Sequence, residues 1–151
     1  MTKDELERLN RTVEAFCSYI ESLPPEALTE QEWGPKEVLA HLVFHHQGYV
    51  AMAEAIAQGK PLIPPKGRFR DINAYAVDKS RGVDTAELVE QFRQVNHRLV
   101  ALYQSSDPEA VSFRIKQDSK LFSLTELVPA AEAHIRNHQR KLEREQLKRG
   151  Y

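Results

Sequence analysis

Two pairs of histidines are the residues in this sequence with the clearest capacity for chemistry. His41 and His45 form one pair and His134 and His138 the other, each with four-residue spacing. On an α-helix this spacing points both imidazoles in one direction, one turn apart. Two ring nitrogens placed in this way can bind one metal ion. A single pair also fits a partly exposed helix edge where both rings bond to neighbours or water, so the presence of two pairs strengthens the metal interpretation.

Other catalytic chemistries find less support in the sequence. The second pair reads His-Ile-Arg-Asn-His over residues 134–138, so it lacks the glutamate of the HExxH metalloproteases. No Gly-x-Ser-x-Gly segment occurs that would support Ser/His/Asp catalysis. The single cysteine, Cys17, falls on an apolar helical stripe and predicts a packed thiol. A thiol reaction would therefore need an external thiol.

Long helical segments must position these histidines, because apolar residues recur at three- and four-residue intervals. We predict helices over 3–22, 35–58 and 71–80, a main third helix after Gly82, and a last helix from Ser123. Capping-box spacing occurs at Thr2/Glu5, Asp84/Glu87 and Ser123/Glu126. Pro129 indicates either a tolerated kink or a later helix start. Residues 111–115 predict a short extended stretch.

The helical pattern turns both histidine pairs toward the interior, where helix bundles build metal sites. Burying several imidazoles without a metal or a hydrogen-bond partner would be costly. His45 lies nearer the centre of its apolar face than His41, yet both face inward, so periodicity leaves open which of them joins the second pair. His46 and His97 lie off the apolar stripes and are predicted to be surface residues.

The chain of 151 residues is predicted to be one domain, 1–151, of the all-α class. The fold expected is an antiparallel four-helix bundle with an elaborated crossover between the second and third long helices. Hydrophobic residues make up 41% and charged residues 28%, and the net charge of −1 argues against nucleic-acid binding. No apolar stretch is long enough for a bilayer, and the first ten residues lack a signal-peptide pattern. We expect a soluble, cytoplasmic protein with no membrane partner.

The histidines sit in motifs that resemble a known family. The segment from Glu32-Trp33-Gly34-Pro35 to His41-Leu42 resembles the start of the second helix in DinB/YfiT-like proteins, and an HxxxH in the last helix matches 134–138. The stretch Asp71-Ile-Asn73-Ala, followed by Arg81-Gly82, is similar to relatives of mycothiol-dependent maleylpyruvate isomerase. Each motif is short, so the specificity comes from their order and separation across nearly the whole chain.

The resemblance implies a three-histidine metal site made by His41, His134 and His138. In this family the metal is zinc, nickel or iron, and water fills the open positions. Characterised relatives are S-transferases that use bacillithiol or mycothiol and a thiol-dependent isomerase, which implies a low-molecular-weight thiol as co-substrate. His45 is an addition to the minimal pattern and could be a fourth ligand, a proton shuttle or a hydrogen-bond donor to a ligand.

The function expected is a divalent-metal-dependent transferase or hydrolase acting on a small molecule. His45 or Tyr49, one and two turns beyond His41, could move protons. Arg70 and Asn73 could hold a polar or anionic substrate, although Arg70 could equally be solvated and Asn73 could bond to backbone. The alternatives are a bundle that binds or sequesters a metal or small ligand without turnover, and a structural module with fortuitous histidines. A homodimer would agree with the family, but no apolar stripe specifies one.

Overall fold

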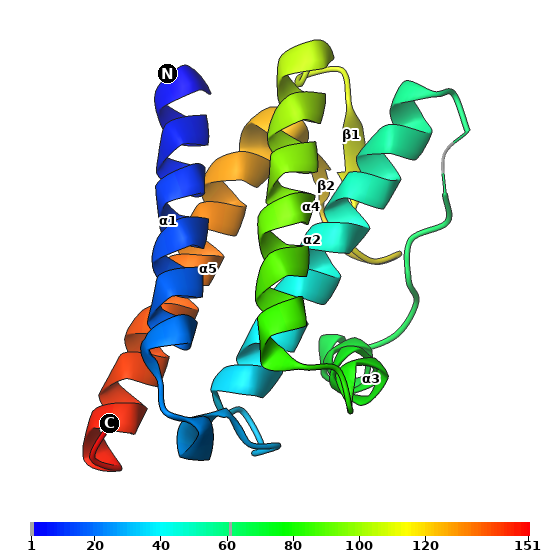
Figure 1. Cartoon of the computed structure of the whole chain (residues 1–151). Coiled ribbons are helices and arrows are strands. Elements are labelled where there is room, and N and C mark those ends of the chain that lie inside the picture. Colours follow the sequence, from blue (N-terminus) through cyan, green and yellow to red (C-terminus); the bar gives the residue numbers. More distant parts are fainter. Residues whose placement is uncertain (1, 61) are drawn as a thin grey trace.

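The computed structural model describes residues 2–60 and 62–151, and its secondary structure is mainly helical, as predicted (Figure 1). The α-helices are α1 (Thr2–Ser22), α2 (Pro35–Ala57), α3 (Phe69–Ser80), α4 (Thr85–Ser105) and α5 (Leu124–Lys148). A 3-10 helix, Pro25–Leu28, precedes α2, and the antiparallel strands β1 (Ser112–Arg114) and β2 (Leu121–Ser123) precede α5. The extended stretch at β1 was predicted, whereas β2 and the 3-10 helix were not.

Four long helices share one hydrophobic core. The helix α1 packs against α4 and α5, and α2 also packs against α4 and α5. Phe16 of α1 meets Phe92 of α4 edge to face, with ring centroids 6.1 Å apart, and both side chains are fully buried. Leu39 of α2 and Ile135 of α5 complete the centre of this core. Burial of each such side chain contributes roughly 1.5–3 kcal/mol, which is what holds the two histidine-bearing helices together.

The directions of the long helices do not simply alternate along the chain. Figure 1 shows α2 and α4 running the same way, and α1 and α5 running together in the opposite direction. Two contacts between α2 and α4 agree with this. His46 bonds to Asn96, and Glu54, later in α2, bonds to Arg98, later in α4, so both helices advance in the same direction. The physical reason is the crossover, described over residues 58–60, 62–68 and α3, which returns the chain along α2 before α4 begins.

One of the predicted capping boxes forms and another does not. Ser123 and Glu126 make a full capping box at the start of α5, each side chain accepting a hydrogen bond from the other residue's backbone N–H. The helix then continues through Pro129, so it begins ahead of the proline. Asp84 precedes α4 but makes no side-chain cap, and the predicted box with Glu87 is wrong. The Thr2 side chain lies outside the described residues.

The burial of three side chains was predicted from the periodicity, and the fold confirms two of these predictions. Cys17 is fully buried and burial raises the pKa of its thiol to about 12, which confirms a packed thiol. His97 is exposed, as predicted. His46 is 2% exposed, so its surface assignment is wrong. Its Nε2 lies 3.1 Å from the Asn96 Oδ1 atom, and this partner on α4 makes its burial tolerable.

No helix in the described part of the chain has the length and apolar character needed to cross a membrane.

Candidate metal centre

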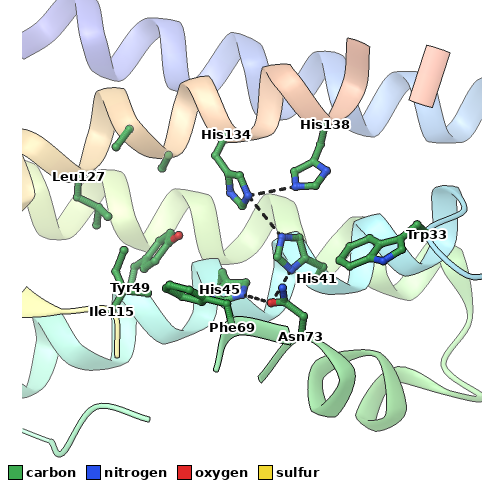
Figure 2. Close-up of a pocket in the computed structure, with 12 residues that line it drawn as sticks. Trp33, His41, His45, Tyr49, Phe69, Asn73, Ile115, Leu127, His134 and His138 are labelled. Atoms are coloured by element: carbon green, nitrogen blue, oxygen red, sulfur yellow. Dashed lines mark hydrogen bonds between the residues drawn. The ribbon is translucent and has the colours of Figure 1, made fainter. Parts of the chain in front are cut away.

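Three histidine nitrogens converge between α2 and α5. The helix α2 presents His41, and α5 presents His134 and His138 from successive turns (Figure 2). The Nε2 atom of His134 lies 3.4 Å from the His41 Nε2 and 3.1 Å from the His138 Nε2. Two nitrogens bound tetrahedrally to one zinc at about 2.0–2.1 Å would be about 3.3–3.4 Å apart. Two of the three distances are therefore close to those of a metal site, and all three nitrogens lie within 4.8 Å of one another, so the group could hold a metal ion. This is the ligand set implied by the family resemblance.

Asn73 fixes the orientation of His41. The Nδ1 atom of His41 lies 3.0 Å from the Asn73 Oδ1 atom. An amide oxygen only accepts hydrogen bonds, so this Nδ1 carries the proton and the Nε2 lone pair faces His134. Histidine ligands of metals commonly have their other ring nitrogen held by such an acceptor. This contact thus selects the tautomer that can bind a metal.

His45 shares the same acceptor and does not join the three nitrogens. Its Nε2 atom lies 2.8 Å from the Asn73 Oδ1 atom, so the oxygen receives an N–H from each of two imidazoles. Of the three roles open for His45, this contact fits a hydrogen-bonded neighbour of the ligands. The sequence had suggested Asn73 as a substrate contact, whereas its oxygen is engaged by histidines here. The sequence periodicity did not indicate that α3 would pack beside His41 and His45 of α2.

The site histidines are neutral near pH 7. Burial, followed by the neighbouring histidines, lowers the pKa of His41 to about 3. Burial, followed by His138, lowers the pKa of His134 to about 4, and the pKa of His138 is lowered mainly by burial and then by Lys141. A metal binds the deprotonated ring nitrogen, so these groups need lose no proton to bind one.

Trp33 closes one side of the site. Its ring stacks on His138, with centroids 6.4 Å apart and planes 15° apart, and meets His41 edge to face at 5.6 Å. The backbone of Trp33 has φ 53°, a left-handed conformation that is uncommon for a residue other than glycine. Its backbone N–H donates to the Glu37 carboxylate at 3.0 Å. The sequence singled out this tryptophan only as part of the family motif, not as a neighbour of the ligands.

The three imidazoles line a cavity of about 380 Å³. Tyr49 also lines it, and burial raises the pKa of this phenol to about 12, so the hydroxyl stays protonated. Phe69 and Asn73 bring the crossover side of the fold to the same cavity (Figure 2). Arg70 is not brought there. Its side chain is 81% exposed, and its closest anionic neighbour is Asp71 at 3.9 Å, so its position fits a solvated residue.

Comparison with known proteins agrees with this architecture. Searches of curated proteins and of solved structures found no match to the chain. The sequence profile of the DinB superfamily, in contrast, matches residues 8–142, a stretch that contains both histidine pairs, Asn73 and Trp33. Since this match spans most of the 151 residues, the chain belongs to the DinB superfamily.

Proposed function

We propose that this protein is a divalent-metal-dependent enzyme that carries out a transfer or hydrolysis reaction on a small molecule. The observation that carries the proposal is the convergence of three neutral Nε2 atoms, 3.1 and 3.4 Å apart, on the wall of a cavity of about 380 Å³. Catalytic metal sites typically have three protein ligands and leave a position for water or substrate. A closed structural site would have a fourth protein ligand, and His45 instead bonds to Asn73.

Zinc, nickel and iron all suit imidazole ligands. When bound, such an ion lowers the pKa of a water or a thiol and stabilises the resulting anion as a nucleophile. His41, His134 and His138 would hold it. Asn73 keeps the lone pair of His41 turned toward the other two ligands.

The remaining polar groups of the cavity can handle protons. His45 is neutral near pH 7 because burial lowers its pKa, and its Nε2 proton is engaged by Asn73. Its Nδ1 atom is therefore the basic nitrogen that could accept a proton. Tyr49 keeps its proton at pH 7 and can donate a hydrogen bond to a polar substrate atom.

We further propose that the nucleophile is an external low-molecular-weight thiol. Cys17 is fully buried in the core, away from the cavity lining, and its pKa of about 12 leaves it protonated. The chain therefore has no thiol of its own for this chemistry. The thiol-dependent relatives that the sequence resembles support the same choice.

The first test is the metal content of the purified protein, grown with several metals supplied. A His134→Ala/His138→Ala variant removes two ligands, and His97→Ala removes an exposed histidine as the matched control. We expect about one metal per chain in the parent and the control, and none in the double variant. Transfer of thiols to electrophiles would then be assayed.

The outcomes separate the alternatives. Stoichiometric metal with no turnover of any thiol or electrophile would favour a protein that binds or sequesters its ligand. Absence of metal from the parent and the His97→Ala control, even after incubation with zinc, nickel and iron, would refute the metal-dependent proposal.

A further inference from the structure

We propose that the substrate carries an apolar group, a phenyl ring or a short alkyl chain, and that this group binds in a second cavity beside the histidines. The second cavity has a volume of about 330 Å³ and lies between α2, the crossover and β1. The proposal rests on the proposed function only for the reacting end of the substrate. The apolar end depends on the second cavity alone.

The walls of the second cavity are almost entirely apolar. Phe44 and Met52 come from α2, Ile72 from α3 and Phe113 from β1. Among the described residues that line it, His45 and Tyr49 alone have polar side chains. A cavity with such walls favours apolar ligands because binding removes apolar surface from water. Its size is sufficient, since a closed apolar cavity of roughly 150 Å³ can hold benzene.

Exposed apolar side chains border the same cavity. Leu62 and Ile63, in the segment before α3, are 51% and 83% exposed and line its wall. Backbone contacts hold the next part of this segment in place, because the Gln117 N–H donates to the Pro65 carbonyl oxygen at 2.9 Å. Large apolar side chains left uncovered around a cavity are typical of ligand-binding sites.

The second cavity adjoins the histidine cavity. His45, Tyr49, Phe69 and Ile115 line both. Figure 2 shows Tyr49, Phe69 and Ile115 together on one side of His41, with Trp33 on the opposite side. One elongated molecule can therefore place a polar, reactive end near the histidines and an apolar end beyond Tyr49. The order of these side chains gives the substrate a direction in the site.

Gly48 gives independent support for an open second cavity. It lies inside α2, where glycine is the least favourable residue apart from proline. A Cβ atom added there would meet no heavy atom within 4 Å, so packing does not require glycine. Its φ is also not positive, so backbone conformation does not require it either. Gly48 is exposed and lines the second cavity, so its missing side chain leaves this wall of the cavity open to a ligand.

The test uses the full chain, both metal-free and loaded with zinc, with calorimetry as the readout. The probes are benzyl alcohol, 2-phenylethanol, 3-phenyl-1-propanol and 4-phenyl-1-butanol. The affinity of the parent protein should rise roughly fourfold with each added methylene, as burial of apolar surface predicts. Gly48→Leu fills the cavity, and Gly48→Ala is the matched control, since both substitutions remove the unfavourable helical glycine.

We expect Gly48→Leu to weaken binding of 4-phenyl-1-butanol by about tenfold or more, and Gly48→Ala to change it by less than about threefold. Equal binding by the parent and Gly48→Leu, or no rise in affinity along the series, would overturn the assignment of this cavity.

Zinc titration of the same variants separates this inference from the proposed function. Gly48 does not line the histidine cavity, so both variants should bind zinc as the parent does. If neither the parent nor the Gly48 variants bind zinc but the probes behave as expected, the proposed function fails and the apolar site stands. If zinc binds normally and Gly48→Leu still binds the probes, the apolar site alone is refuted.

Discussion

Replacement of Asn73 by alanine should weaken metal binding without removing a ligand. The substitution deletes the one oxygen that accepts from His41 Nδ1 at 3.0 Å and from His45 Nε2 at 2.8 Å. The His41 ring then loses the contact that keeps its Nε2 lone pair facing His134. Loss of such a partner typically lowers metal affinity by about 10- to 100-fold. We expect the Kd for zinc to rise by that factor.

The same substitution should also destabilise the metal-free protein. Each buried N–H left without an acceptor costs roughly 1–3 kcal/mol. His41 and His45 are 4% and 8% exposed, yet both line a cavity that water can enter. We therefore expect the lower end of the range for each ring, a total of about 2 kcal/mol. Urea unfolding of the metal-free protein measures this loss.

Competition with a chelator of known affinity measures the zinc Kd. Asn73→Asp is the matched control, because a carboxylate also accepts both N–H groups and makes the ligand more basic. The Asp variant should bind zinc at least as tightly as the parent. A folded Asn73→Ala protein whose Kd lies within about twofold of the parent would refute the role of Asn73 in orienting His41.

Three further predictions test other parts of the structure. Trp33 is the only tryptophan and its ring lies 5.6 Å from His41, so bound Ni²⁺ should quench its fluorescence, and the quenching should be absent in His134→Ala. His46 has its pKa lowered by burial to about 4, below its ordinary value of 6.5, so the unfolded chain binds more protons below pH 6.5. His46 alone should therefore lower the free energy of unfolding by about 3 kcal/mol from pH 6.5 to pH 4, and His46→Gln should remove that contribution from a pH series of urea melts, leaving the contributions of the other buried histidines. Phe16→Ala should cost about 3–5 kcal/mol in the same melts, because it leaves a cavity against Phe92, and a loss below about 1 kcal/mol would contradict the packing described.

Local patterns in the sequence predicted the parts of the fold that depend on local contacts. The apolar stripes gave the helices to within a few residues, and the box of Ser123 and Glu126 gave the start of α5. The inward-facing histidine pairs gave the four candidate imidazoles. Helical periodicity has no direction, however, so it could not show that α2 and α4 run the same way.

Contacts between distant segments were beyond the reach of these patterns. His46 is separated by 50 residues from Asn96, the partner that makes its burial tolerable. His41 is 32 residues from Asn73, on a different element. Periodicity could not show which of His41 and His45 joins the second histidine pair. In the structure His41 bonds to Asn73 through Nδ1, which leaves its Nε2 facing His134, whereas His45 bonds to Asn73 through Nε2.

The residues of the candidate metal centre come from both long helices and connecting segments. The helices α2 and α5 supply the three nitrogens, and the apolar core fixes their separation. The groups that set the chemistry of those nitrogens come from elsewhere: Asn73 from the crossover and Trp33 from the turn before α2.

The backbone of Trp33 is the one non-glycine position with positive φ in the described residues, a conformation that costs roughly 1–3 kcal/mol. The Glu37 carboxylate accepts a hydrogen bond from the Trp33 N–H, and the indole packs on two of the three histidines. The strained backbone of Trp33 thus lies beside the histidines rather than in the core. Changes in the connecting segments should therefore alter metal affinity and substrate choice while leaving the helical core intact.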